Sequence, residues 1–582
     1  MHLLCGDYLI QFTGGQENNL SIEKSEYSMQ KKSKAIGKFI YATILILFIL
    51  PLLVFSQVEN VPISHPVYEF LFRSESRGLL PHFSTSQLPL QRNEIISALN
   101  IINQNKDKLT DVEKHILDEH LIDFNVLPIE KAVLIYSETE KNQVFSSSFF
   151  HDNDKYIYYF QDSVNSVKLK PLASVEALFS SEEVKSRNVT LGELGFRLYG
   201  SLGKHFGYFL QATNGMLING DRNLALEEFH KLKQNVKFAD LNSDFDFSES
   251  HIRFDYDWFY AIIGRETRLV GSGIAQRLFV SNNAAPGDAF SIGARFSNFE
   301  YRYTHSGILA VDQAVNKAGF NSSFPEKYLV THRFALKPDW GEVAFWEGII
   351  YSKRGIDLAY INPLSFFKSL EHALHDRDNS LMGGDLTIRF LNNLQLKGSY
   401  LLDDIRFEEI GTGYWSNKSA WNIGLTYNFH FNLDIGLEYA RVEPYTFSHF
   451  DSINSYTNDE MLIGTGLLPN SDEISLILKY WWFGSHHPMI FKVSNERHGA
   501  NIYDENGDLI KNVGADPLQT RRPDDNFKVR FLDGELIKSL KFDFHISYEF
   551  IKDFQVEANY SYRTIIDTKT HLLFIKFSFV DF

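Results

Sequence analysis

The chain has 582 residues, of which 44% are hydrophobic, 22% charged and 15% aromatic, with 50 Phe, 28 Tyr and a single Cys. The aromatic content excludes a largely disordered chain, and one cysteine excludes a disulfide framework. The 57 basic and 73 acidic residues give a net charge of −16. This balance disfavours nucleic acid as a partner, because phosphate binding needs clustered positive charge.

The first predicted element is an export signal. The apolar run 39–55 follows a cluster of four lysines between residues 31 and 38 and ends in Val54-Phe55-Ser56. A basic segment, an apolar segment and small residues just before the cleavage position are typical of a cleaved signal peptide. A single membrane anchor is the alternative, since the run is just long enough to span a bilayer. We expect 29–56 to be the signal peptide and 1–28 to be a mis-called region upstream of the true start.

The next region, 57–164, is predicted to be helical at its beginning and to lie in the periplasm. Apolar residues recur at helical spacing in 91–103, at Ile95, Leu99 and Ile102 among others. Thr110 followed by Glu113 is the pattern of a capping box and predicts the start of a further helix.

From about residue 165 to residue 582 the hydrophobic period changes to two. In 421–439 every odd position is apolar and every even position is small or polar, which predicts two strands joined by a tight turn. A soluble sandwich also alternates in this way. Strands of about 9–11 residues and alternating short and long connections favour a membrane barrel instead. We therefore predict an all-β transmembrane barrel of about 16–18 antiparallel strands with a small N-terminal helical segment, in contact with outer-membrane lipid.

The final segment, 571–582, is aromatic and ends in Phe582. It resembles the signal by which the β-barrel assembly machinery recognises its substrates. We expect that machinery to be a partner of the chain.

Several segments resemble the capsule-assembly proteins of the Wzi family, in the form found in Bacteroidetes. They are HPVYEFLFRSESRGLL with LPLQRNEI, IGRETRLVGSGIAQRLFVSNNAAP, YLVTHRFAL, and WEGIIYSKRGIDLAYINPLSFF. The resemblance implies an outer-membrane barrel that retains or assembles capsular or other surface polysaccharide, as a lectin and not as an enzyme. The polar residues in these segments are expected to line the lumen or shape the loop bases, or else to form a structural packing network: Arg265, His332, Arg333, Glu347, Tyr360 and Asn362.

Long polar loops rich in aromatic residues suit sugar recognition, because an aromatic ring covers the apolar face of a sugar and planar polar groups meet its hydroxyls. A pair of arginines suits an acidic polysaccharide. The candidate glycan-contacting residues are Tyr414, Trp415, Tyr445, His449, Arg521 and Arg522. The alternative is that these aromatic residues pack the loops together and that the arginines belong to a charge network with nearby aspartates.

No catalytic, cofactor or metal site is predicted. The histidine pairs His372/His375 and His486/His487 lack further ligands at recognisable spacing and are interpreted as surface residues. Trp481 is interpreted as part of an interfacial aromatic belt. Two functions remain: a non-catalytic polysaccharide-binding protein of the bacterial outer membrane, and a porin-like diffusion channel for small polar solutes.

Overall fold

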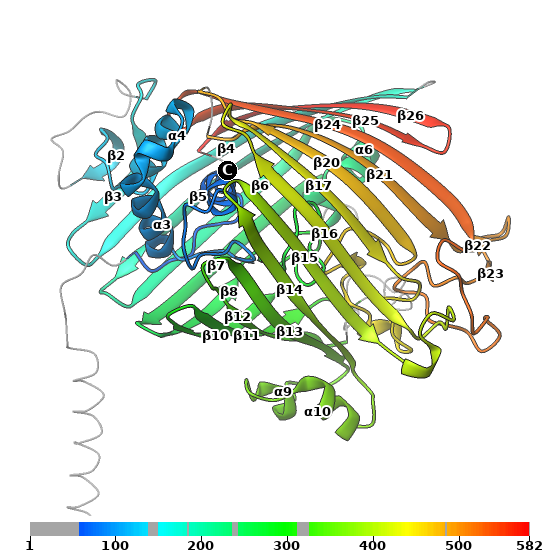
Figure 1. The fold of residues 1–582 in the computed structure, drawn as a ribbon. Helices are drawn as coiled ribbons and strands as arrows, with labels where there is room; N and C mark the ends of the chain where they lie inside the picture. The colour runs from blue at the N-terminus through cyan, green and yellow to red at the C-terminus, as the bar shows by residue number, and fades with distance from the viewer. Residues whose placement is uncertain are drawn as a thin grey trace, which may run out of the picture. The chain divides into compact units, whose positions relative to one another are not determined.

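The computed structural model describes residues 57–137, 149–182, 185–235, 243–310, 325–483 and 486–580, so the predicted signal peptide lies outside the described part. Eighteen antiparallel strands form a closed barrel (Figure 1), as the alternation predicted. In order around the wall they are β4 (Ser166–Glu182), β5 (Ser186–Leu202), β6 (Phe206–Gly220), β7 (Asp244–Tyr256), β8 (Phe259–Arg265), β10 (Asp288–Phe296), β11 (Phe299–Ile308), β12 (Lys327–Leu336), β13 (Gly341–Ser352), β14 (Asn379–Leu391), β15 (Leu394–Asp404), β16 (Lys418–Asn428), β17 (Leu433–Val442), β20 (Ser471–Tyr480), β21 (Met489–Ala500), β24 (Glu535–Ile551), β25 (Phe554–Ile565) and β26 (Thr568–Phe579). The barrel closes where β26 pairs with β4, from Ala173 opposite Phe579 to Glu182 opposite Thr570.

The wall has an apolar outer face and a polar inner face. On β16 the side chains of Ile423 and Leu425 point outward and are 48% and 42% exposed, whereas Asn422 and Asn428 point inward and are buried. Exposed aromatic side chains also gather beside the short turns, as in the girdle of an outer-membrane barrel. They are Phe206, Tyr256, Trp258, Phe296, Trp340, Phe390, Phe431 and Phe550. These features fit a wall with lipid outside.

The two ends of the barrel differ in their connections. One end has turns such as 297–298, 337–340 and 392–393, and both the start of β4 and the end of β26 lie there. The other end has connections such as 353–378, 443–470 and 501–534. Outer-membrane barrels keep short turns in the periplasm and long loops outside, so the first end is periplasmic and the second extracellular.

The N-terminal helices are α2 (Val67–Ser76), α3 (Arg92–Gln104) and α4 (Asp111–Asp123), with a 3-10 turn η1 (Lys106–Lys108) before α4. The predicted capping box at the start of α4 is confirmed: Oγ1 of Thr110 accepts the N–H of Glu113 (3.2 Å), and Oε2 of Glu113 accepts the N–H of Thr110 (2.7 Å). After α4, β2 (Lys131–Ser137) pairs in parallel with β3 (Asp154–Gln161), which continues into the sheet beside β4. Every helix in the described residues is too short or too polar to traverse a bilayer.

The long loops carry short elements. They are α6 (Arg222–Glu228), α7 (His230–Lys233), α9 (Leu358–Ile361), α10 (Phe367–Ala373), η2 (Phe407–Glu409), η3 (Ser452–Asn454), β18 (Thr457–Asn458) with β19 (Met461–Leu462), and β22 (Ile502–Tyr503) with β23 (Leu509–Lys511). A further pair, β1 (Gln87–Leu88) and β9 (Leu269–Val270), joins the N-terminal segment to the connection between β8 and β10.

Candidate functional site

Residues 57–104 cross the lumen from its periplasmic end. The backbone N–H of Asn60 donates to Nε2 of His251 on β7 (3.0 Å). In α2, Arg73 forms a buried ion pair with Asp434 on β17. Since β7 and β17 are nine strands apart in a ring of eighteen, this segment contacts opposite sides of the wall.

A second layer comes from the connection 266–287, which folds into the lumen from the extracellular end. This connection pairs with β1 through β9. Further along it, the N–H of Ile274 donates to Oε2 of Glu438 on β17 (2.6 Å). The ring of Phe279 stacks on the indole of Trp346 on β13, with centroids 4.0 Å apart. We call residues 266–287 the inward segment.

A third layer is the loop 443–470, which packs over the inward segment. The hydroxyl of Tyr456 donates to the carbonyl of Phe279 (2.6 Å), and the N–H of Ser281 donates to the carbonyl of Ile463 (2.9 Å). Thus three layers of chain occupy the lumen between its two ends.

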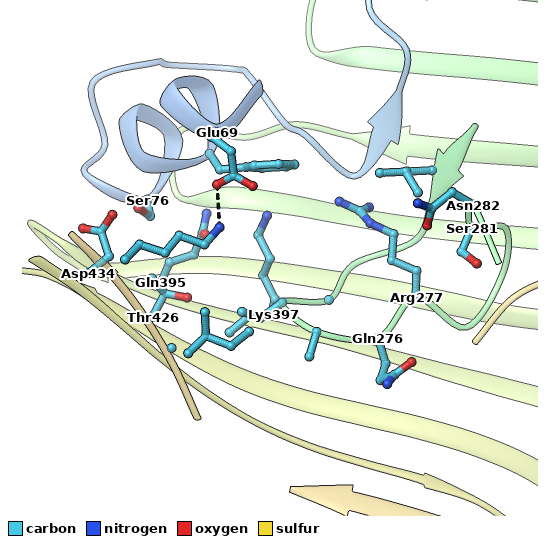
Figure 2. A pocket seen from close by; sticks show the side chains of 18 of the residues that line it. Glu69, Ser76, Gln276, Arg277, Ser281, Asn282, Gln395, Lys397, Thr426 and Asp434 are labelled. Atoms are coloured by element: carbon cyan, nitrogen blue, oxygen red, sulfur yellow. Dashed lines mark hydrogen bonds and ion pairs between the residues drawn. The ribbon is translucent and has the colours of Figure 1, made fainter. Parts of the chain in front are cut away.

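A cavity of about 430 Å³ remains between α2, the inward segment and the wall (Figure 2). Side chains of both charges line it: Lys397, Lys479 and Arg277 lie there with Glu69 and Asp434. Nζ of Lys479 is 2.5 Å from Oε2 of Glu69, and burial lowers the pKa of Arg277 to about 10. The remaining polar lining includes Gln276, Gln395, Thr426 and Asn428. The cavity suits water or a small polar ligand.

Arg333 lies in the lumen. Its guanidinium is 2.6 Å from Oε1 of Glu342 and 3.0 Å from Oδ2 of Asp385, and all three side chains are buried. Oδ1 of Asp385 also accepts the N–H of Ser272 in the inward segment (3.2 Å). Arg333 therefore belongs to the charge network that holds the inward segment to the wall.

His332 and Glu347 do not face the lumen and lie instead at the base of the 353–378 loop. Successive side chains of a strand point to opposite faces, so an inward Arg333 turns its neighbour His332 outward. Nε2 of His332 and Oε2 of Glu347 are 2.7 Å apart, and the same carboxylate accepts the N–H of Phe367 (3.2 Å). The ring of Phe367 stacks on His332 at 4.5 Å. Both residues are thus buried on the outer face beneath the 353–378 loop, which carries α9 and α10.

The other three residues of this set also lie away from the lumen. Tyr360 in α9 is buried under the same loop, and its hydroxyl donates to Oδ2 of Asp378 (2.7 Å). Asn362 is exposed at the end of α9, where its side chain accepts the N–H of Leu364. Arg265 pairs with Asp288 at the extracellular rim (2.9 Å), and both side chains are solvent-exposed.

Two of the six predicted glycan-contacting residues line one cleft. Tyr414 and Trp415 lie in a cleft of about 610 Å³ at the extracellular rim, between the loops that follow β15, β17 and β21. Its wall also includes Tyr400 on the outer face of β15, and the basic residues Arg441 and Arg530. We call this space the rim cleft.

The other four predicted residues pack the loops. Tyr445 is fully buried against Trp415 and Val513. Arg521 lies over the rings of Trp415 and Phe527, at 5.3 and 4.2 Å. Arg522 pairs with Asp525 (2.8 Å), as the charge-network alternative predicted. His449 is largely buried beside Phe450, and burial lowers the pKa of its imidazole to about 4.

Two further interpretations change in the structure. Trp481 is fully buried and donates its indole N–H to Oδ2 of Asp434 (2.7 Å), so it belongs to the lumen and not to the belt. The side chain of His486 is only 13% exposed and lies among Glu119, Asp123 and Glu549, so it is not an open surface residue. His372 is exposed, as predicted.

No family model and no curated protein matches the chain. Solved structures do. Wzi, an outer-membrane protein described as a carbohydrate-binding β-barrel involved in group 1 capsule assembly in Escherichia coli, aligns over 90% of this chain and 99% of its own, with 12% identity and a TM-score of 0.51. OccAB2 of Acinetobacter baumannii and OprD of Pseudomonas aeruginosa align over 71% and 70% of this chain and 98% and 94% of their own, with 11% and 10% identity and TM-scores of 0.42 and 0.39.

This chain has the fold of a bacterial outer-membrane β-barrel. The likeness to Wzi confirms the fold that the sequence resemblance implied. With the apolar wall and its aromatic girdle, the fold places the chain in the outer membrane.

Two arginines beside the rim cleft were not predicted from the sequence. Arg530 lines it and Arg406 lies over the ring of Tyr414, at 5.3 Å. Neither guanidinium has an acidic partner among the described residues, whereas Arg441 pairs with Glu443 (2.7 Å). Both stand alone in long loops, so no sequence spacing marked them.

Proposed function

We propose that this barrel binds surface polysaccharide of the capsular class and helps to retain or assemble it at the outer membrane, without catalysing a reaction. The observation that carries the proposal is the rim cleft on the extracellular side. It combines Tyr414 and Trp415 with Arg530, whose guanidinium has no acidic partner among the described residues. The fold shared with Wzi, itself described as carbohydrate-binding, supports the same direction.

The chemistry of the rim cleft suits an acidic glycan. The aromatic faces of Tyr414 and Trp415 can cover the apolar side of a sugar ring. A guanidinium without an acidic partner is available for a uronate carboxylate, which it contacts through paired N–H donors. The cleft of about 610 Å³ holds a few sugar units of a longer chain.

The three layers in the lumen favour this role over the diffusion channel. A barrel of this strand number is wide enough for a water-filled passage when it is empty. Here the N-terminal segment, the inward segment and the loop 443–470 lie in the lumen, so a channel of full width would require them to move.

Targeting forms part of the proposal. Residues 29–56 would direct export, and β26 would carry the recognition signal for the assembly machinery. Its outward side chains Leu573, Ile575 and Phe577 are 37%, 41% and 45% exposed, which gives that strand an apolar outer face.

Binding of an acidic capsular polysaccharide to the purified protein in detergent tests the function. We expect the wild type to bind, and the affinity to fall at least tenfold in Tyr414→Ala and in Arg530→Gln. The affinity of Arg530→Gln should also depend less on salt concentration than that of the wild type. Tyr503→Ala and Arg265→Gln, an exposed aromatic and an exposed arginine outside the cleft, are matched controls. Equal binding by all five proteins, or none by the wild type to acidic or neutral capsular glycans, would overturn the proposal.

A further inference from the structure

The last turn of α4 meets the periplasmic turn between β20 and β21. His120 and Asp123 are three residues apart on α4 and therefore lie on one face of the helix. Nδ1 of His120 is 3.6 Å from Oδ2 of Asp123. The capping box at Thr110 fixes the start of α4 and hence the direction in which these two side chains point.

His486 of the barrel completes a group of three donors. Its Nδ1 is 3.8 Å from Oδ2 of Asp123, and its ring centroid is 5.4 Å from that of His120. One donor atom of each residue lies within 4.8 Å of the other two. Ligands of a tetrahedral Zn²⁺ at about 2.1 Å are separated from one another by about 3.4 Å, so small adjustments bring the three donors into range.

His120 is a second, independent indication of a ligand. Its side chain is fully buried, and neither ring nitrogen has a hydrogen-bond partner among the described residues. Buried polar groups in proteins are normally satisfied, and an imidazole facing a carboxylate oxygen at 3.6 Å is too far for a hydrogen bond. A metal ion between the two groups would bind one nitrogen of His120 and Oδ2 of Asp123.

The surroundings fit a cation. Nε2 of His486 is 3.3 Å from Oε2 of Glu549 and 3.6 Å from Oε2 of Glu119, so the carboxylates orient the ring with Nδ1 toward Asp123. Nζ of Lys552 holds Oδ1 of Asp123 (2.5 Å) and leaves Oδ2 toward the histidines. Three carboxylates against one ammonium give the surroundings a net negative charge, which favours a divalent cation.

We propose that His120, Asp123 and His486 bind a divalent transition metal of the Zn²⁺ class, with water in the fourth position. Two imidazoles and one carboxylate are a donor set that Zn²⁺ takes readily. Because α4 supplies two ligands and the barrel wall supplies the third, the ion fastens the N-terminal helices to the barrel. The site is separate from the rim cleft and its role is structural.

Cobalt substitution tests the site in the full mature chain. Protein in detergent is stripped with a chelator, dialysed, and titrated with Co²⁺ and, in parallel, with Zn²⁺. We expect one Co²⁺ per chain with the visible absorption of a low-coordinate nitrogen–oxygen site, displacement of Co²⁺ by Zn²⁺, and a higher unfolding temperature with either metal. His120→Gln and His486→Gln should each weaken binding at least tenfold, and Glu549→Gln about tenfold or more.

His372→Gln is the matched control, because His372 belongs to the exposed cluster Glu371, His372 and Asp376, where adventitious binding would occur. Heat-modified gel mobility shows that each variant is folded before titration. The proposal is overturned if the stripped wild type binds no stoichiometric metal, if folded His120→Gln or His486→Gln binds as the wild type does, or if only His372→Gln loses the metal. The first of these outcomes is decisive even if a variant fails to fold.

Discussion

At the scale of single residues, burial distinguishes two arginine–aspartate pairs that have nearly the same nitrogen–oxygen distance. Arg333 and Arg265 each bring Nη2 within 3.0 and 2.9 Å of an aspartate oxygen. The side chain of Arg333 is 2% exposed and that of Arg265 is 46% exposed. An exposed pair contributes little to stability, whereas removal of one partner from a buried pair leaves an uncompensated charge.

Arg333→Ala should therefore lower the free energy of unfolding by about 3–5 kcal/mol, because Asp385 and Glu342 lose their common cation. Arg265→Ala should change it by less than about 1 kcal/mol. Urea unfolding in detergent, followed by tryptophan fluorescence, measures both. Equal effects of the two substitutions would contradict the structural role of Arg333.

His449 should make the loop 443–470 sensitive to acid. Burial, together with the nearby Lys418, lowers the pKa of this imidazole to about 4 in the folded loop, against about 6.5 in an unfolded chain. Between these values the opened loop binds a proton that the closed loop does not. Loop stability is then constant above about pH 6.5 and falls as the pH decreases toward 4, by about 3 kcal/mol at most. His449→Gln should remove this part of the pH dependence.

Hydrogen exchange of residues 443–470, compared between wild type and His449→Gln at each pH from 4 to 7, measures the effect. The ratio of the exchange rate in the wild type to that in His449→Gln should be constant above pH 6.5. Below pH 6.5 this ratio should increase progressively as the pH falls. A ratio that does not change with pH would show that His449 is not the acid-sensitive group.

At the scale of elements, the two-residue pattern predicted the strands well because each strand has one face in lipid and one in a polar interior. The pattern at 421–439 becomes β16, β17 and the short turn between them. The pattern does not indicate where another element covers the outer face. Polar residues on outward positions of β12 and β13, such as His332 and Glu347, belong under α10 and not in the lumen. The strand period already placed His332 and Arg333 on opposite faces, but the covering loop comes from tertiary packing that no local pattern encodes.

The candidate site shows the same limit. Tyr414 and Trp415 were predicted from their residue types, and both line the rim cleft. Arg521 and Tyr445 have equally suitable side chains, yet they stack on or against Trp415 and hold the loops together. Which loop residue faces solvent depends on how three loops, separated by many residues, pack on one another.

The packing of α10 on the wall depends on Phe367. Its side chain is fully buried on His332, whereas that of its neighbour Phe366 is 48% exposed. Phe367→Ala should weaken the attachment of the 353–378 loop by about 3–5 kcal/mol. Limited trypsin digestion in detergent should then cleave at Lys368 and Arg377 faster than in the wild type. Phe366→Ala is the control and should remain as resistant as the wild type; equal resistance of both variants would mean that other contacts hold the loop.

At the scale of the whole molecule, the closed ring and the filled lumen have different origins. The alternation along every strand determines the ring, since each strand must pair on both sides and present one apolar face. The filling comes from polar contacts between distant segments, such as Asn60 with His251 and Ile274 with Glu438. The number of strands was therefore predictable within a narrow range, whereas the occupation of the lumen was not.

The filled lumen predicts that the wild-type protein in planar lipid bilayers shows no steady conductance. Replacement of 272–283 by a short Gly-Ser linker removes the middle layer, including the hydrogen bonds to Glu438 and the stack of Phe279 on Trp346. The loop 443–470 then loses its contact with Phe279, so we expect discrete ion-conducting steps in this variant. Shortening the β22–β23 hairpin, whose Tyr503 and Ile510 are exposed, is the matched control and should leave the barrel silent. Stable conductance by the wild type would instead favour the function of a diffusion channel. It would mean that the three layers leave an open passage in the unaltered protein.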